Sequence, residues 1–169
     1  MSFQEDVMES RDRRPADEII MFRAPVLRQK TRPVRKVNAQ IKRTLEQMLD
    51  VMYEANGVGL AGPQVGLDRS VIVVDVGDGP VKLVNPQIMS SEGSFSMVEG
   101  CLSLPGINGE VERPAKVSVK ALDESGRDVW IDADGYLARA LQHEIDHLDG
   151  RLFIDRAKTL IIAREDDEV

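Results

Sequence analysis

The sequence lacks cysteine pairs, long apolar runs and an apolar N-terminal leader. Its single cysteine, Cys101, excludes an internal disulfide and leaves that thiol as a buried structural residue, a nucleophile or a metal ligand. The longest apolar runs, such as 71–74, have the length of a strand and are too short to span a bilayer. The first residues are rich in acidic side chains, which excludes an organelle transit peptide. We therefore expect a cytoplasmic protein with no membrane association.

Positive charge is also in deficit. The chain has 22 Lys and Arg against 29 Asp and Glu, for a formal net charge of −7. This balance argues against direct DNA binding and against non-specific binding to nucleic acid or anionic membrane, without excluding a local basic patch. At 169 residues with 42% hydrophobic content, the chain is long enough for one domain with its own core. We expect a loosely ordered extension over 1–18, one domain over 19–163 and an acidic tail over 164–169.

Histidine is scarce, and both copies lie in one short motif. His143 and His147 are four residues apart, so a helix presents both imidazoles on one face, where they can bind one metal ion. Glu144 lies close enough to handle the proton of a reacting water. This is a hydrolytic arrangement, and the competing interpretation is a surface helix with two solvated histidines.

Hydrophobic periodicity predicts two helices. Apolar residues recur at helical spacing over 34–55, which predicts a long N-terminal amphipathic helix. A second helix begins after Asp134 as N-cap, carries the two histidines and ends at Gly150. Its other face carries Leu137, Leu141, Ile145 and Leu148, which can pack on a sheet.

Short apolar or alternating segments predict the strands. They are 19–22, 70–76, 81–84, a resumption at 87–89 after a break at Asn85–Pro86, the hairpin of 116–122 with 127–131, and 152–154. Residues 99–105 read as a rigid loop that ends in proline.

A catalytic metal needs a third protein ligand beside the two histidines. The position of a third histidine in one extended metalloprotease motif is occupied by Phe153, which excludes that class. Glu165 and Glu168 follow in the charged tail and are poorly supported as ligands. Cys101 is the remaining soft donor, with a buried structural cysteine as the alternative.

Glycine punctuates residues 57–66, which permits close approach of a ligand or another strand to the backbone. Gln64 is the only side chain there with both a donor and an acceptor. The stretch lacks the lysine and glycine spacing of a phosphate-binding loop.

Three stretches together carry a resemblance to a known family. Gly-Val-Gly-Leu-Ala-Gly-Pro-Gln at 57–64, Glu-Gly-Cys-Leu-Ser-Leu-Pro at 99–105 and Gln-His-Glu-Ile-Asp-His at 142–147 resemble, in order and approximate spacing, the signature motifs of peptide deformylases. The resemblance extends from about Pro25 to about Asp155. Gly62 departs from it, because the family motif usually has alanine there.

The resemblance implies an α+β fold in which antiparallel strands surround the helix with the His-Glu-x-x-His motif. It implies one divalent metal ion per chain, held by Cys101, His143 and His147: iron(II) in the cell, with zinc, nickel or cobalt as alternatives in purified protein. The implied reaction removes the formyl group from the N-terminal formyl-methionine of newly made polypeptides. We expect a monomeric hydrolase, with the ribosome as a second candidate partner.

The resemblance also implies roles for individual residues. Glu144 would be the general base, and the Gln64 side chain and the Leu102 backbone N–H would stabilise the oxyanion. The substrate would lie along Val58, Gly59, Leu60 and Gly100, with Tyr136, Arg139 and Ala140 lining the pocket for methionine.

Two further expectations concern charged side chains. Arg139 either covers the pocket with its methylenes while its guanidinium reaches solvent, or is an exposed helix residue. Glu99 and Arg113 either pair to brace the metal-binding loop or form an ordinary surface pair.

Two other functions remain open from the residues alone. The first is a small metallopeptidase that uses Glu144, with Cys101 as a bystander. The second is a non-enzymatic binding module in which a fully coordinated metal serves folding only.

Overall fold

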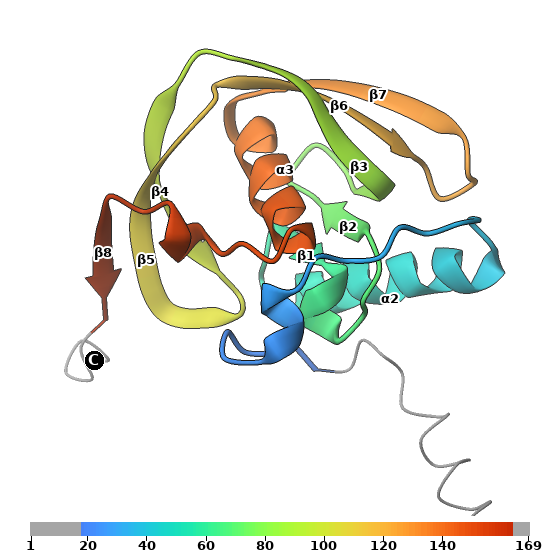
Figure 1. The fold of residues 1–169 in the computed structure, drawn as a ribbon, viewed down its shortest axis with the longest axis horizontal. Coiled ribbons are helices and arrows are strands. Elements are labelled where there is room, and N and C mark those ends of the chain that lie inside the picture. The colour runs from blue at the N-terminus through green and yellow to red at the C-terminus, as the bar shows by residue number, and fades with distance from the viewer. Residues whose placement is uncertain (1–17, 164–169) are drawn as a thin grey trace, which may run out of the picture.

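The computed structural model describes residues 18–163 (Figure 1). The predicted extension, apart from Glu18, and the predicted acidic tail lie outside the described residues. Within the described range, two α-helices combine with eight strands that form two antiparallel sheets, so the predicted α+β class is confirmed. None of the helices described is long and apolar enough to cross a membrane.

The larger sheet has five strands in the order β1-β2-β3-β6-β7, and every neighbouring pair is antiparallel. The strands are β1 (Gly59–Ala61), β2 (Val71–Val74), β3 (Val81–Glu92), β6 (Lys116–Leu122) and β7 (Asp128–Asp134). The predicted hairpin corresponds to β6 and β7. Among the described strands β1 has a neighbour on one side only, so it forms an edge of the sheet.

The two helices cover opposite faces of this sheet. Alternate residues of a strand point to opposite faces, and β2 shows this directly. Ile72 and Val74 belong to the apolar cluster of α3 (Gly135–Leu148), whereas Val71 and Val73 belong to the cluster of α2 (Ala39–Glu54). The predicted packing of the histidine-bearing helix on a sheet is confirmed.

The smaller sheet joins β4 (Phe95–Cys101), β5 (Leu104–Arg113) and β8 (Thr159–Ile162) in the order β4-β5-β8. The expectation of a loop over 99–105 was wrong, because these residues belong to a tight hairpin in which Cys101 pairs with Leu104. In Figure 1 this sheet lies on the side of α3 away from β6 and β7, so α3 lies between the two sheets.

Three other predicted boundaries were wrong. Residues 19–22 form no strand, although the backbone N–H of Ile20 donates to the Gln64 carbonyl (2.7 Å). Strand β3 continues through Asn85 as a bulge, where φ is +51° and the Asn85 side chain bonds both backbone polar groups of Val34. Residues 153–155 form a 3-10 turn, and the last strand is β8.

The predicted helix over 34–55 corresponds to α2, which begins at residue 39. Its N-cap is Asn38, whose side chain accepts the N–H of Ile41 (3.0 Å). An asparagine cap of this kind satisfies a donor that the first helical turn leaves without a partner, so the helix begins after Asn38 and residues 34–37 lie outside it.

Candidate active site and metal centre

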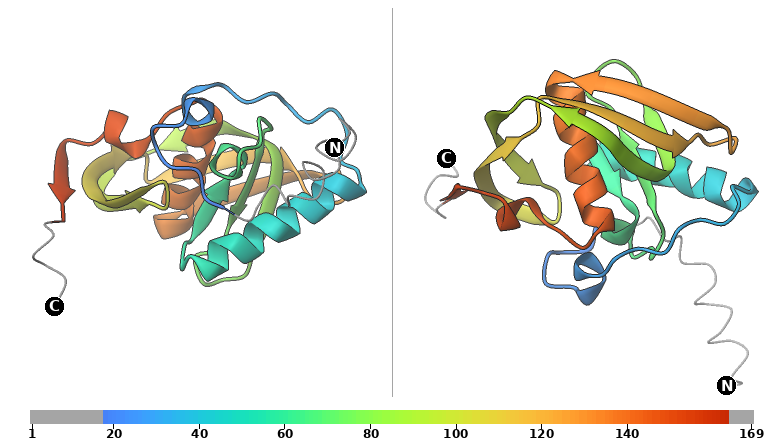
Figure 2. Two further views of the ribbon diagram at one scale, coloured as in Figure 1. Left: turned by 90° about the horizontal axis from the view of Figure 1, so that it is seen from below. Right: turned by 45° about the horizontal axis from the view of Figure 1, so that its top comes forward.

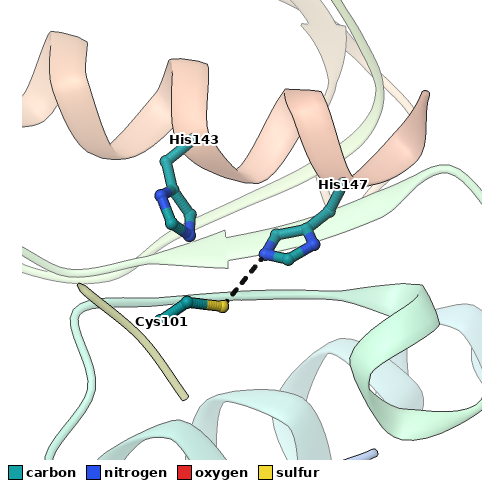
Figure 3. Close-up of side chains that lie close together, drawn as sticks. All are labelled: Cys101, His143 and His147. Atoms are coloured by element: carbon teal, nitrogen blue, oxygen red, sulfur yellow. Dashed lines mark hydrogen bonds between the residues drawn. The ribbon is translucent and has the colours of Figure 1, made fainter. Parts of the chain in front are cut away.

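Helix α3 and the end of strand β4 bring together the three predicted metal ligands. His143 and His147 are one turn apart, with ring centroids separated by 5.1 Å, and Cys101 is the last residue of β4. One ligand atom from each of the three residues lies within 4.8 Å of the other two, and the Cys101 Sγ is 3.4 Å from the His147 Nε2 (Figure 3). A thiolate and two imidazoles are a donor set typical of zinc, iron(II), nickel or cobalt.

Glu99 fixes the orientation of the first imidazole. The Nδ1 of His143 lies 2.8 Å from the Glu99 Oε1, so this nitrogen donates to the carboxylate and Nε2 remains available to a metal ion. Carboxylates that orient ligating histidines in this way are a regular component of metal sites. The three ligands and this support therefore fit a divalent metal ion.

A buried ion-pair network surrounds Glu99. The Arg113 guanidinium donates to both Glu99 oxygens (2.6 and 2.9 Å) and to the Asp146 Oδ2 (2.9 Å). Asp146 also accepts two hydrogen bonds from Arg156 (2.7 and 2.9 Å). Glu99 and Arg113 are buried, so the expectation of an ordinary surface pair was wrong.

Arg139 belongs to the same network, and both expectations for its guanidinium were wrong. The side chain is 2% exposed, and its Nη1 pairs with the Glu99 Oε2 at 2.5 Å. The guanidinium also donates to the carbonyls of Val111 (3.0 Å) and Phe95 (2.8 Å). The Arg139 Cζ lies 4.6 Å from the centroid of the Phe95 ring. The strands of the smaller sheet thus supply acceptors where solvent was expected.

Gln64 is held with its amide facing the cysteine. Its Oε1 accepts the backbone N–H of Ala61 (2.9 Å), which directs Nε2 toward the Ser103 Oγ (3.0 Å) and the Cys101 Sγ (3.5 Å). Leu102 follows Cys101 in the turn between β4 and β5. The Gln64 amide group therefore lies beside a candidate metal ligand with its rotamer fixed.

Glu144 is buried next to the three candidate metal ligands. It is 4% exposed, and its Oε2 has no hydrogen-bond partner within the described part of the chain. Burial raises the pKa of this carboxyl to about 7, with a further increase from Glu99, while His143 and Arg113 act in the opposite direction. A carboxyl with a pKa near neutrality is suited to accepting and then donating a proton.

The neighbouring groups show shifts of both signs. Burial opposes ionisation of Glu99, but hydrogen bonds from His143 and Arg113 outweigh it and lower the Glu99 pKa to about 2. Burial disfavours the imidazolium of His143, yet hydrogen bonds with Cys101 and Glu99 raise its pKa to about 10. For His147, burial and the positive charge of His143 both lower the pKa well below its usual value. The carboxylate at Glu99 is therefore a permanent acceptor for the His143 Nδ1.

A cavity of about 320 Å³ opens beside these groups. The structure places nearly all of the predicted substrate-binding residues on its wall, together with residues of the metal site: Val58, Gly59, Gly100, Leu102, Tyr136, Arg139, Ala140, His143 and Glu144. Leu60 is instead buried in the α2 cluster. Glycine keeps the cavity open, because a Cβ at Gly59 would lie 2.4 Å from the Glu144 Oε1.

The sequence interpretation missed three members of the site: Ser103, Asp146 and Arg156. Ser103 is fully buried and accepts from the Gln64 amide. Asp146 lies inside the histidine motif, and that position was the only available signal. No sequence signal pointed to Arg156, because its partner Asp146 is ten residues away across a turn.

Comparison with known proteins identifies similar chains. The family model described as polypeptide deformylase matches residues 16–161. A peptide deformylase of Symbiobacterium thermophilum is 53% identical over 154 residues, covering 89% of this chain and 71% of the relative. A peptide deformylase of Alkaliphilus metalliredigens is 56% identical over 132 residues, covering 78% of this chain and 90% of the relative.

Solved structures agree in fold. The crystal structure of the Thermotoga maritima peptide deformylase superposes with a TM-score of 0.82 at 44% identity, covering 84% of this chain and 97% of that one. The Synechococcus elongatus peptide deformylase, crystallised with actinonin, superposes with a TM-score of 0.83 at 43% identity, covering 86% and 80%.

Proposed function

The chain belongs to the polypeptide deformylase family, and from this premise we propose how its own residues carry out the reaction. The enzyme is a metal-dependent hydrolase that removes the formyl group from nascent peptides. The observation that carries the residue assignment is the convergence of Cys101, His143 and His147 within 4.8 Å, beside a buried Glu144.

The three converging residues would hold one divalent ion, for which we propose iron(II) in the cell. Such an ion supplies Lewis acidity, which lowers the pKa of a water and polarises the formyl carbonyl. A thiolate ligand is also compatible with zinc, nickel and cobalt. In a Cys101→Ala variant we expect metal content to fall, because the remaining two imidazoles are an incomplete site.

Glu144 would act as the general base and then as the general acid. Its carboxylate takes a proton from the attacking water, and the same oxygen later delivers a proton to the leaving amine nitrogen. The C–N bond then breaks, which releases formate and the free N-terminus. The elevated pKa caused by burial supports this exchange.

Gln64 and Leu102 would stabilise the oxyanion that develops on the formyl oxygen. The Gln64 Nε2 is already directed toward Cys101 by the bond between its Oε1 and the Ala61 N–H. The Leu102 backbone N–H would be the second donor. Loss of one such donor costs on the order of 10² to 10³ in rate, so Gln64→Leu should retain metal while losing that much turnover.

The formyl-methionine end of the substrate would bind between the edge of the sheet and the cavity. Strand β1 has a free edge along which Val58, Gly59 and Leu60 could pair with an extended peptide. The cavity wall formed by Gly100, Tyr136, Ala140 and the aliphatic part of Arg139 would receive the methionine side chain. We propose a monomer that acts in the cytoplasm near the ribosome, because nascent chains arise there.

The decisive experiment joins metal analysis to a formate assay. Protein purified without oxygen should contain one equivalent of metal and release formate from a formyl-methionine peptide. Glu144→Gln should keep the metal and lose about 10² to 10⁴ in turnover.

Asp149→Asn is the matched control, because Asp149 is an exposed acid at the end of the same helix, and it should have parental activity. Parental activity in Glu144→Gln would remove this residue from the mechanism. Metal without formate release would instead favour a peptidase or a purely structural metal site.

A further inference from the structure

One segment of this acidic protein is purely basic. Residues 19–45 contain no Asp or Glu, so all 29 acidic residues of the chain lie elsewhere, whereas 8 of the 22 basic residues fall within it. They are Arg23, Arg28, Lys30, Arg32, Arg35, Lys36, Lys42 and Arg43. This is the local basic patch that the overall charge does not exclude.

All eight side chains are exposed, and most have no counter-ion in the described structure. Within residues 18–163, Arg28 pairs with Asp155 and Arg32 with Asp68, while the other six form no ion pair with a described residue. We define the basic strip as Lys30, Arg32, Arg35, Lys36, Lys42 and Arg43. Figures 1 and 2 show the chain running over 30–43 to the end of the molecule opposite β8.

The fold adds to this positive potential at the start of α2. The N-terminus of a helix is the positive end of its dipole and is normally favoured by acidic residues. The first turn of α2 has no acidic residue; Arg35 and Lys36 precede it, and Lys42 and Arg43 follow in the next turn. These cations are unfavourable for the isolated helix, and a bound anion would relieve their repulsion.

We propose that the basic strip binds the phosphate backbone of structured RNA. Arginine, half of the strip, pairs with phosphate through two parallel hydrogen bonds, and successive cations match the repeating charge of a polyanion. An anionic membrane is the poorer fit, because the strip offers no apolar anchor. Between residues 30 and 43 no large hydrophobic side chain is exposed, and Leu45, Met48 and Met52 of α2 are fully buried.

The geometry allows RNA binding and catalysis at the same time. The 16 residues of α2 span about 24 Å, and the helix ends just before Asn56 and Gly57 on the cavity wall. RNA on the strip therefore leaves the cavity mouth open. Nascent chains emerge from the ribosome, so we identify this RNA as ribosomal RNA, a step that rests on the proposed function.

The test measures binding of the full-length protein to a labelled 20-base-pair RNA duplex of arbitrary sequence, and to purified bacterial ribosomes, at 50 to 200 mM salt. Arg35→Gln with Lys36→Gln removes two strip charges. We expect at least tenfold weaker binding at 50 mM salt and a decrease of about 1.4 to 1.8 in the slope of log affinity against log salt.

Lys116→Gln with Lys158→Gln is the matched control, because it removes two exposed cations that do not lie beside the strip and changes net charge equally. Its affinity should stay within twofold of the parent. Absence of RNA binding by the parent, equal losses in both variants, or tighter binding to phosphatidylserine vesicles than to RNA would overturn the proposal. Formate release from a formyl-methionine tripeptide should be parental in both variants, so a failed docking surface is distinguishable from a failed assignment of the reaction.

Discussion

The two helices of this enzyme bury very different side chains. In α2 only Thr44, Leu45, Met48 and Met52 are buried, and Ile41, Leu49 and Val51 are partly buried beside them, so one face contacts the sheet and the opposite face is exposed to solvent. In α3 every residue from Ala138 to Leu148 is buried. Six of these residues are polar: Arg139, Gln142, His143, Glu144, Asp146 and His147. Both helices are therefore amphipathic, but the polar face of α2 is exposed to solvent whereas most of the polar face of α3 is buried.

The smaller sheet accounts for the difference. The apolar face of α3 packs on the five-stranded sheet, as α2 does on the other side, and the hairpin of β4 and β5 then covers its polar face. Buried polar groups are tolerated only when they are paired, and Glu99 and Arg113 from this hairpin supply the partners. In α3, burial of polar residues therefore marks the chemistry of the site.

The largest expected effect on stability comes from breaking the ion pairs against α3. Arg113→Met leaves two buried carboxylates short of donors, which should lower the free energy of unfolding by about 3 to 5 kcal/mol and reduce metal retention through Glu99 and His143. Urea unfolding and metal analysis would measure both effects. Arg127→Met, at an exposed turn, should cost less than about 0.5 kcal/mol. A loss below about 1 kcal/mol for Arg113→Met would show that the pairs do not hold the hairpin on α3.

A cavity under α2 should reduce stability without affecting the site. Met48 is fully buried between α2 and the sheet, so Met48→Ala should cost about 2 to 5 kcal/mol. Measured well below the melting temperature, kcat/KM should be parental. Gln40→Ala, exposed on the same helix, is the control. A matching loss of turnover in Met48→Ala would mean that the two helices are not independent.

Removing Arg139 should have an intermediate effect. In Arg139→Leu, Glu99 keeps its bonds to Arg113 and His143, but the carbonyls of Phe95 and Val111 lose a donor. We expect a loss of about 1 to 3 kcal/mol in urea unfolding. Arg139→Lys retains the charge but loses the planar guanidinium with its several donors, so the stability of this variant should lie between that of Arg139→Leu and that of the parent. Equal stability of the Lys variant and the parent would indicate that charge alone matters.

The smallest effect concerns the helix caps. The Asn38 side chain caps α2, whereas Asp134 at the same position of α3 makes no such bond. Asn38→Ala should therefore cost about 1 kcal/mol, and Asp134→Ala a few tenths through the helix dipole. Paired thermal unfolding curves would compare them, and a larger loss at Asp134 would reverse the comparison.

The sequence was sufficient to predict the group of three candidate metal ligands, because their signals are local. The spacing of His143 and His147 follows from the helical repeat, and Cys101 is the single thiol in the chain and lies in a motif that resembles a deformylase signature. The hairpin of β6 and β7 was predictable for the same reason, since alternation and a turn fix it locally.

Long-range pairing could not be predicted. Arginine rarely avoids solvent, and only the return of β4 against α3 brings Glu99 within reach of Arg139. The apolar triplet at 152–154 has the composition of a strand, yet the chain turns there and the strand forms at 159–162, where β5 offers an edge. Asp146 is part of the histidine motif, but its partners, Arg113 and Arg156, lie outside that motif.

The glycine at position 59 bears on how an inhibitor of this enzyme could lose its effect. Any replacement adds a Cβ within 2.8 Å of three Glu144 side-chain atoms, and Glu144 is itself buried and unable to move away cheaply. A mutation of Gly59 that blocked a compound bound to the Gly59 backbone would therefore also displace Glu144, the proposed base. Escape would have to come from other parts of the cavity wall, such as the half-exposed Tyr136 or Val98.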